Sequence, residues 1–341
     1  MNEHPATGRH DRFLWVGSYT PTMGGAGAGI GLLRVRAADD ALEFLGTVAE
    51  TSSPSFVSPS VDGRVLYSAD EAGRVEAFRR GPDHTLKALG GQPTSGGFPC
   101  HLSVTSDHLY ACNYGDGSID VFPLDHEGRI GPARQRLASR GSGPNPAQDG
   151  PHAHSTLVIG DTVLSADLGT DRVHAHSADG GTLARTASAI LPPGTGPRDL
   201  RVHGDRVILL GELSGGVFAL DGTGAVVASG RLVESWVDGD HAAGLAVDST
   251  GTFLYSGLRG SNRIAVVRLS DLSAVADVPC EGDWPRHLCI LPGADEDDLL
   301  LVANQLSSSI AGFRIDRATG IPRPSGSPVR VASPTFLQPV L

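Results

Sequence analysis

The chain has 341 residues and a formal net charge of −11, and it contains 45 glycines and 23 prolines. This length exceeds what one ordinary core needs, and it suits either a large single-domain all-β architecture or two domains. The negative charge argues against a nucleic-acid partner and against binding to an anionic membrane surface, whereas a small anionic substrate stays compatible because a few local arginines can hold it.

The N-terminal segment is polar and the rest of the chain is rich in short apolar runs. Residues 1–12, MNEHPATGRHDR, lack the apolar stretch of a signal peptide, so we expect a flexible tail followed by a single domain over residues 13–341. No apolar run approaches the roughly 20 residues that a membrane-spanning helix needs. The four cysteines, Cys100, Cys112, Cys280 and Cys289, form no CxxC pair and are expected to be free thiols. These features predict a cytoplasmic protein.

From residue 54 onward, a unit of about 45 residues repeats along the chain. Each unit starts at a proline, or in one case an aspartate, that precedes a short apolar strand, and successive starts are 45, 52, 46, 43, 45 and 49 residues apart. Alternating β-branched and small residues bounded by Gly, Asp and Ser predict a second, a third and a weaker fourth strand in each unit. Such units are typical of the four-stranded antiparallel blades of a β-propeller. The starts are Pro54, Pro99, Pro151, Pro197, Asp240, Pro285 and Pro334.

The two ends of the chain are predicted to complete the ring. The N-terminal segments FLWVGSY, GIGLLRV and LEFLGTV resemble the second to fourth strands of a unit, and the C-terminal PTFLQPV resembles a first strand without a successor. We therefore predict an all-β, seven-bladed propeller whose N- and C-terminal strands share one blade, an arrangement that removes two exposed sheet edges.

Polar side chains recur at two positions of the repeat. The start of the first strand and the end of the second strand open on the same face of a propeller, so each position forms a ring around the central channel. His154 is expected to point the same way as His152, because residues i and i+2 of a strand share a face. The first ring is predicted to hold Ser55, His101, His152, Arg198, His241, Arg286 and Thr335, and the second Tyr19, Glu71, Tyr114, Leu168, Glu212, Arg259 and Gln305.

Histidines, arginines and glutamates that converge on a concave mouth indicate a binding or catalytic site. Polar residues at strand ends also serve simply to satisfy loop backbone or water in wet channels. The clustering of several titratable types favours the functional interpretation.

The segments VGSYT, GPNPAQDGPHAHS, ADLGTDRV, GPRDL and VANQLSSSI lie between Phe13 and Leu341. Together they resemble the seven-bladed β-propeller lactonase family, which includes bacterial propeller-type 6-phosphogluconolactonases and fungal carboxymuconate-lactonizing cyclases. The resemblance implies a site of one histidine, two arginines and one glutamate, and these match His154, Arg198, Arg259 and Glu212. This chain has Gly-Glu where the family usually has Asn-Glu, and Leu-Arg-Gly where Asn-Arg-Gly is frequent, so a specialised relative is an alternative.

Lactone hydrolysis requires a nucleophilic water and a stabilised oxyanion at the ring carbonyl. His154 is assigned to proton transfer, because the pKa of an unperturbed imidazole lies near 6.5. Glu212 is assigned to orienting or charging His154, and Arg198 and Arg259 to binding the anionic group and the carbonyl oxygen. Further substrate contacts are expected from His152, His101, Arg286, Glu71, His241, Gln305 and Tyr19.

Two other functions fit the same fold. A lactonizing cyclase would use the same residues to add a carboxylate to an activated double bond. A non-enzymatic scaffold would present aromatic or aliphatic hot spots on its rim, and aromatic residues make up only 5% of this chain. We therefore favour a lactonase that acts on a small anionic lactone, as a monomer or weak homo-oligomer.

The pair His152-x-His154, with Glu71 or Glu212, is also a candidate metal-ligand set. The ring positions are richer in Arg and His than in Asp and Asn, which disfavours a hard cation such as calcium. We predict neither a metal nor a cofactor.

Overall fold

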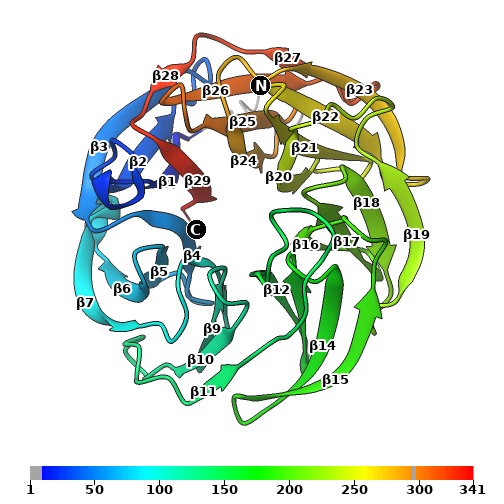
Figure 1. Ribbon diagram of the computed structural model, residues 1–341. Coiled ribbons are helices and arrows are strands. Elements are labelled where there is room, and N and C mark those ends of the chain that lie inside the picture. Colours follow the sequence, from blue (N-terminus) through cyan, green and yellow to red (C-terminus); the bar gives the residue numbers. More distant parts are fainter. Residues whose placement is uncertain (1–9, 294–296, 341) are drawn as a thin grey trace, which may run out of the picture.

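The computed structural model describes residues 10–293 and 297–340. Within these ranges, seven antiparallel sheets surround a central channel, each with its first strand innermost (Figure 1). The predicted seven-bladed propeller is therefore confirmed. The described part of the chain contains only two helices, the short 3-10 turns η1 (Pro21–Met23) and η2 (Pro82–His84), and neither could cross a membrane.

Each blade extends from a strand beside the channel to a strand at the outer rim. In that order, the first three blades in the ring comprise β29 (Pro334–Pro339), β1 (Arg12–Ser18), β2 (Gly29–Val35) and β3 (Leu42–Glu50); β4 (Pro54–Pro59), β5 (Val65–Asp70), β6 (Arg74–Arg80) and β7 (Leu86–Pro93); and β8 (Pro99–Val104), β9 (His108–Asn113), β10 (Ile119–Pro123) and β11 (Gln135–Leu137). The next two comprise β12 (Ala153–Ile159), β13 (Thr162–Asp167), β14 (Arg172–Asp179) and β15 (Thr182–Ile190); and β16 (Pro197–His203), β17 (Arg206–Gly211), β18 (Gly216–Leu220) and β19 (Val226–Arg231). The last two comprise β20 (His241–Val247), β21 (Phe253–Arg259), β22 (Arg263–Arg268) and β23 (Ser273–Pro279); and β24 (Pro285–Leu291), β25 (Leu299–Asn304), β26 (Ser309–Ile315) and β27 (Pro322–Pro324), with the extra strand β28 (Val329–Arg330) paired to β26.

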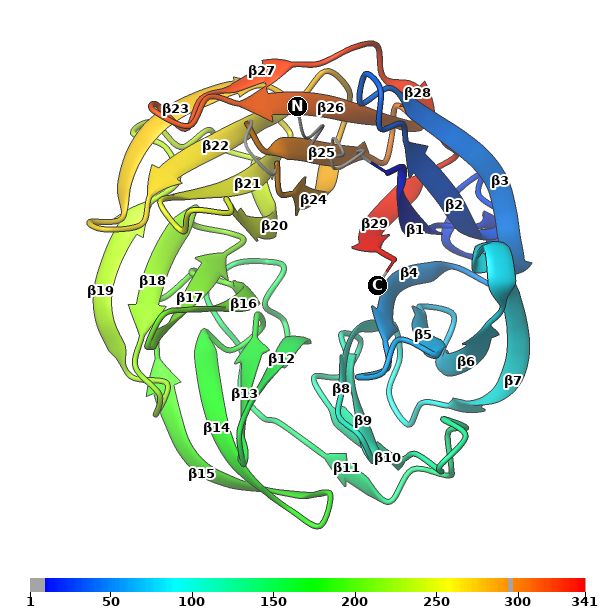
Figure 2. The same cartoon turned by 180° about the vertical axis from the view of Figure 1, so that it is seen from behind.

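The chain termini share one blade, as predicted. The C-terminal strand β29 lies beside the channel and pairs with β1, with Val16 opposite Leu337 (Figure 2). Strand β1 begins at Arg12, so the last residue of the expected tail belongs to the blade. Residues 1–9 of that tail lie outside the described residues.

The core is divided among the contacts between neighbouring blades. Each blade packs against a neighbour on both faces, and the second strands β5, β9 and β25 are accordingly buried along their whole length. One cluster joins β17 and β18 to β21 and β22 through residues such as Leu210, Leu254 and Val267. At about 1.5–3 kcal/mol for each large apolar side chain buried, these clusters hold the ring together. All four cysteines are free, as expected, and three of them are buried.

A β-bulge recurs at the start of the first strand. In the blade of β16, Pro197 pairs with Gly211 and Asp199 pairs with Leu210, which leaves Arg198 unpaired between them. A bulge bends its strand and re-aims the extra side chain, here at the channel. Among the described first strands, the equivalent residues are Ser55, Cys100, His154, Arg198, Arg286 and Thr335.

This register corrects the predicted first ring at three positions. Ala153, rather than Pro151, occupies the place of the other prolines, so His154 is the ring member and His152 precedes the strand. In β8, Pro99 does occupy the expected place, and the ring member is Cys100, the residue directly after it, rather than His101. In β20 the bulge lies later, between Ala243 and Ala246, and His241 pairs with Arg259. Cross-strand hydrogen bonds set the register, and a proline in the preceding connection does not.

The second ring lies where the sequence placed it. In six of the seven blades, the residue that directly follows the second strand donates its backbone N–H to the carbonyl of the residue before the first strand, for example Glu212 to Gly196 at 2.8 Å and Tyr114 to Phe98 at 3.0 Å. Arg259 is instead the last residue of β21. These backbone bonds fix the backbone of the second ring, and four of its side chains, those of Tyr19, Glu71, Tyr114 and Arg259, line the mouth of the channel.

Candidate active site

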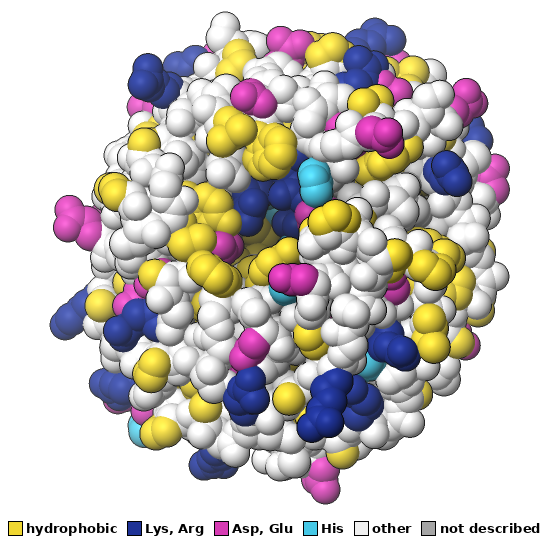
Figure 3. Space-filling view, viewed as in Figure 1, with side chains coloured by type: hydrophobic (Ala, Val, Ile, Leu, Met, Phe, Trp, Pro, Cys, Tyr) yellow, Lys and Arg dark blue, Asp and Glu magenta, His cyan; other side chains and the backbone are white. Residues whose placement is uncertain are grey.

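A cavity of about 660 Å³ opens at the mouth of the channel. Figure 3 shows a central hollow in which basic side chains gather, with hydrophobic side chains around it. Six of the predicted site residues line this mouth cavity, namely His154, Arg198, Arg259, Arg286, Glu71 and Tyr19. Tyr114 of the second ring lines it too, together with three residues that the sequence pattern did not single out, Met23, Phe98 and Cys100.

Glu212 holds the two arginines implied by the family resemblance. Its carboxylate forms an ion pair with Arg198, and its Oε1 lies 2.7 Å from Arg259 Nη2. His241 Nδ1 lies 3.3 Å from the same Oε1. Burial by itself raises the pKa of Glu212, but the guanidinium groups of Arg259 and Arg198 outweigh it and hold the pKa well below its usual range. Glu212 is therefore ionised at neutral pH, and it orients both arginines.

Both arginines are buried and still charged at neutral pH. Arg198 is 7% exposed and Arg259 is 5% exposed. Burial lowers the pKa of Arg259 to about 10. Burial acts in the same direction on Arg198, but the carboxylates of Glu212 and Asp199 outweigh it and raise the pKa above its ordinary value. The Arg259 guanidinium also lies 5.6 Å from the centre of the Trp284 ring, a cation–π contact that helps to fix its plane.

His154 presents a neutral imidazole to this group. The side chain is buried in the bulge of β12, and the edge of its ring meets Tyr114 with the ring centres 6.1 Å apart. Burial, reinforced by the positive charge of Arg198, holds the pKa of His154 well below 6.5. The unprotonated ring can accept a proton at neutral pH, which is the requirement for a general base.

A second charged cluster lies on the side of the cavity formed by β1, β5 and β24. Arg286 Nη2 donates to the hydroxyl oxygen of Tyr19 at 2.5 Å, and that hydroxyl donates to Glu71 Oε2 at 2.8 Å. Arg286 Nη2 also lies 3.5 Å from Glu71 Oε1. Three guanidinium groups thus line the mouth cavity beside one lining carboxylate, that of Glu71. The cavity therefore favours an anionic ligand.

The remaining predicted contacts are not among the residues that line the mouth cavity. His152 stacks on Tyr114 with ring centres 4.4 Å apart, and its Nδ1 lies 2.6 Å from the Tyr114 carbonyl oxygen. His241 borders Glu212 and the Trp284 ring. Gln305 donates its backbone N–H to the carbonyl of Trp284 at 3.0 Å.

His101 lies deeper in the channel. It lines a narrow inner cavity together with His154 and Arg198. Its ring packs on Phe56, with ring centres 4.3 Å apart, and burial lowers its pKa to about 3. His101 is therefore a neutral, packed residue of the channel wall.

The metal-ligand alternative depends on His152 and His154 facing the same way. His152 precedes β12, whereas His154 occupies the bulge, so the two rings have different surroundings. Within residues 10–293 and 297–340, no three His, Cys, Asp or Glu side chains are grouped closely enough to hold a metal ion.

Two residues of the channel were missed by the reasoning from sequence. Cys100 directly follows Pro99, and a strict count of one residue after each proline would have found it. Asp199, in the motif GPRDL, lines the inner cavity, and its Oδ1 lies 3.9 Å from His154 Nδ1. Its position next to Arg198 gave no signal, because an alternating strand would turn it away from the site. Only the bulge at Arg198 brings both side chains to the channel.

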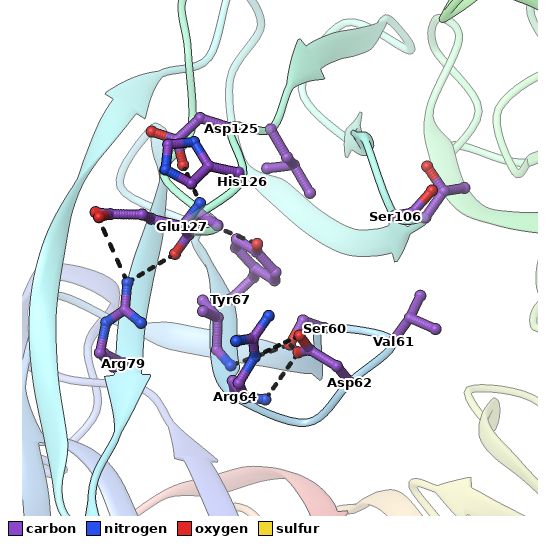
Figure 4. Close-up of a pocket in the computed structure, with 14 residues that line it drawn as sticks. Ser60, Val61, Asp62, Arg64, Tyr67, Arg79, Ser106, Asp125, His126 and Glu127 are labelled. Atoms are coloured by element: carbon purple, nitrogen blue, oxygen red, sulfur yellow. Dashed lines mark hydrogen bonds and ion pairs between the residues drawn. The ribbon is translucent and has the colours of Figure 1, made fainter.

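A larger cavity, of about 790 Å³, lies at the other end of the strands between the blades of β4 and β8 (Figure 4). It is formed by turns and by residues of β5 and β6, and its arginines are paired within the cavity. Arg64 Nε donates to Asp62 Oδ2 at 2.6 Å, and Arg79 Nη2 donates to the carbonyl oxygen of Glu127 at 3.0 Å (Figure 4). The charged groups of the mouth cavity are buried, and this makes the mouth cavity the stronger candidate for the active site.

Comparison with known proteins identifies the family of the chain. The family model "Lactonase, 7-bladed beta-propeller" matches residues 13–339, and the chain therefore belongs to this family of enzymes, as its motifs indicated. The 6-phosphogluconolactonases of Bacillus subtilis and Formosa agariphila are similar to it, at 27% and 30% identity over 90% of this chain and 92% and 93% of theirs. The solved structure of a periplasmic gluconolactonase from Pseudomonas aeruginosa matches with a TM-score of 0.88 and 27% identity, over 97% of this chain and 99% of that one.

Proposed function

We propose that this enzyme hydrolyses a small anionic sugar lactone of the 6-phosphogluconolactone type. The observation that carries the proposal is a buried, neutral imidazole, His154, that lines one cavity with Arg198 and Arg259, both held by Glu212. The names of the relatives support the same substrate class.

In the proposed reaction, His154 accepts a proton from water as the water oxygen attacks the lactone carbonyl carbon. The carbonyl oxygen becomes an oxyanion, and the guanidinium groups of Arg198 and Arg259 stabilise it. The tetrahedral intermediate then collapses, the bond to the ring oxygen breaks, and the imidazolium returns its proton to that oxygen. The products are a hydroxyl group and a carboxylic acid, and the acid then loses its proton to solvent.

The geometry suggests a different role for Glu212 from the one assigned on the sequence alone. Its carboxylate oxygens are engaged by Arg198, Arg259 and His241. We assign it to holding the guanidinium groups in place rather than to orienting His154. Buried charge-assisted pairs of this kind keep donors aimed at the position where negative charge develops.

Arg286 is assigned to the anionic group of the substrate. It lines the mouth cavity, while Tyr19 and Glu71 hold its guanidinium group from one side. Guanidinium groups bind phosphate and carboxylate through paired hydrogen bonds, so this residue suits a phosphorylated or carboxylated lactone. His101, His152, His241 and Gln305 are assigned to supporting the wall and rim of the site.

The test is a panel of lactones assayed for acid release above the spontaneous rate. The panel contains 6-phosphogluconolactone, unphosphorylated gluconolactone and a muconolactone. We expect the anionic sugar lactone to be opened fastest, and His154→Ala to abolish most of this turnover while the fold is retained. Inactivity of the native enzyme on the whole panel would overturn the proposal, and turnover only of the muconolactone would favour the cyclase-type relatives.

A further inference from the structure

Asp199 is the carboxylate that faces His154. Its Oδ1 lies 3.9 Å from His154 Nδ1, within ion-pair distance. His154 Nδ1 is buried and has no hydrogen-bond partner among the described groups. Hydrogen bonds in unliganded active sites are commonly long and shorten in the complex with substrate. The two groups are therefore placed to form a hydrogen bond in the working enzyme.

The second oxygen of Asp199 is fixed from a different blade. Gly244 donates its backbone N–H to Asp199 Oδ2 at 3.1 Å, and Arg198 Nε lies 3.5 Å from the same oxygen. With Oδ2 occupied in this way, Oδ1 is the oxygen that faces the imidazole. Asp199 thus has one anchored oxygen and one oxygen directed at His154.

The displaced bulge of β20 supplies this anchor. The pairing of β20 with β21 shifts between Ala243 and Ala246, later than in the other first strands, and Gly244 lies inside the shift with a φ of 71°. A Cβ at this position would lie 3.0 Å from the backbone nitrogen of Leu288. The left-handed backbone and the close approach both favour glycine. The displaced bulge of β20 therefore directs the backbone N–H of Gly244 toward the carboxylate of Asp199 in the neighbouring blade.

The other charged groups around His154 have different effects. Arg198 and Arg286 are positively charged and disfavour its protonation, and His101 acts in the same direction. Glu212 is negatively charged but is engaged by its two arginines. Asp199 is the acidic group that lies within ion-pair distance of the imidazole.

We propose that Asp199 is a positioning residue that accepts a hydrogen bond from His154 Nδ1 and so leaves Nε2 unprotonated toward the mouth cavity. This inference rests on the proposed function of His154 as a base. A neutral imidazole carries one proton, and the nitrogen that faces an acceptor keeps it. The other nitrogen then carries the lone pair that removes a proton from water, and the ring cannot rotate away from this orientation without losing the bond.

The variant Asp199→Asn gives a specific expectation. Gly244 N–H requires an acceptor, so the asparagine carbonyl oxygen takes that place and the amide NH2 faces His154 Nδ1. An amide donor beside Nδ1 favours the tautomer of His154 that carries its proton on Nε2. The nitrogen that faces the cavity then has no lone pair with which to accept a proton from water. We expect kcat to fall about 100-fold while KM stays within about twofold, because the substrate-binding arginines are unchanged.

The decisive measurement is the tautomer of His154 by long-range proton–nitrogen correlation NMR on the full chain labelled at histidine. The chain has 13 histidines, and His154→Gln identifies the signal by its loss. We expect the native protein to carry the proton on Nδ1, and Asp199→Asn to move it to Nε2. Asp248→Asn is the matched control, because Asp248 is a buried carboxylate beyond the far end of β20 that accepts from Thr252 and Phe253 N–H at 2.8 and 2.7 Å. It should change neither the tautomer nor kcat.

A proton on Nε2 in the native protein overturns the proposal, even if Asp199→Asn does not fold. The proposal is also overturned if Asp199→Asn folds and the tautomer of His154 is the same as in the native protein. The NMR result is independent of turnover. A native enzyme with the expected tautomer but no activity on the lactone panel would refute the proposed function and leave the positioning role standing.

Discussion

Glu212 and Arg259 belong to neighbouring blades, and Arg259 Nη2 lies 2.7 Å from Glu212 Oε1 with both side chains buried. Arg198, from the same blade as Glu212, pairs with the other carboxylate oxygen. The cluster therefore ties two blades together and also holds the two charges assigned to the transition state. One carboxylate serves both the stability of the ring and the site.

The first prediction concerns the removal of this carboxylate charge. Glu212→Gln leaves the buried guanidinium group of Arg259 without its counterion and Arg198 with Asp199 alone, so we expect a loss of about 3–5 kcal/mol in the free energy of unfolding. The measurement is urea-induced unfolding at pH 7. Glu43→Gln is the control, because Glu43 pairs with Arg34 on the exposed surface and should cost about 1 kcal/mol or less. Equal losses for the two variants would contradict the prediction.

The second prediction concerns the pH dependence of turnover. His154 acts in its unprotonated form, and burial with the nearby Arg198 holds its pKa well below 6.5. Activity is therefore expected to persist as the pH falls through 6.5 and to be lost only at lower pH, as the imidazole gains a proton. The measurement is kcat/KM against pH, which reports groups of the free enzyme. An acid limb centred at or above pH 6.5 would argue against His154 as the base.

The third prediction concerns substrate charge. Arg286→Gln removes a guanidinium group that lines the mouth cavity and leaves the Glu212 cluster intact. We expect KM for 6-phosphogluconolactone to rise at least about tenfold, the equivalent of about 1.4 kcal/mol, with a much smaller change for unphosphorylated gluconolactone. Steady-state kinetics on both lactones provide the comparison. A parallel rise for both would show that Arg286 does not recognise the anionic group.

The fourth prediction concerns stability in acid. His174 and His176 are buried on β14, next to Ser188 and Ser165. Burial lowers their pKa to about 3 and about 4. Because these values lie below the 6.5 of the unfolded chain, the unfolded state binds more protons between pH 6.5 and 4. The stability that these neutral, buried histidines contribute is therefore fully present above pH 6.5 and is lost as the pH falls toward 4.

The test of the fourth prediction is the free energy of unfolding of His176→Gln at pH 8 and pH 5. The value at pH 8 measures the cost of lost packing, so the difference between the two pH values isolates protonation. We expect the native protein to lose about 2 kcal/mol more than the variant between pH 8 and pH 5. An equal loss in both proteins would assign acid sensitivity to other groups.

Much of the fold could be predicted from sequence because a propeller repeats one local pattern. The alternation of short apolar strands with Gly, Asp and Ser turns records where each strand begins and ends, and the unmatched PTFLQPV predicts the shared blade of β29 and β1. The second-ring residues, such as Glu212 and Tyr114, could also be placed, because they directly follow apolar second strands that are almost wholly buried.

The first ring could be placed only in part: Ser55, Arg198, Arg286 and Thr335 lie where they were predicted, whereas three other positions do not. A shift of one residue in strand pairing moves every side chain to the opposite face, and a bulge reverses the shift locally. Pro151 stands two residues ahead of the true register, so His152 was expected where the structure has His154. Local composition does not contain this information, because the register is set by hydrogen bonds to the neighbouring strand.

The sequence by itself determined the number of blades, the closure of the ring and the residue types that gather at one mouth of the channel. Only the tertiary structure decided which charges meet: Glu212 with Arg198 and Arg259, and Asp199 with His154. These partners lie on different strands or in different blades, and long-range packing and β-bulges bring them together. The spacing of residues along the chain contains no information on long-range packing or on the positions of the β-bulges.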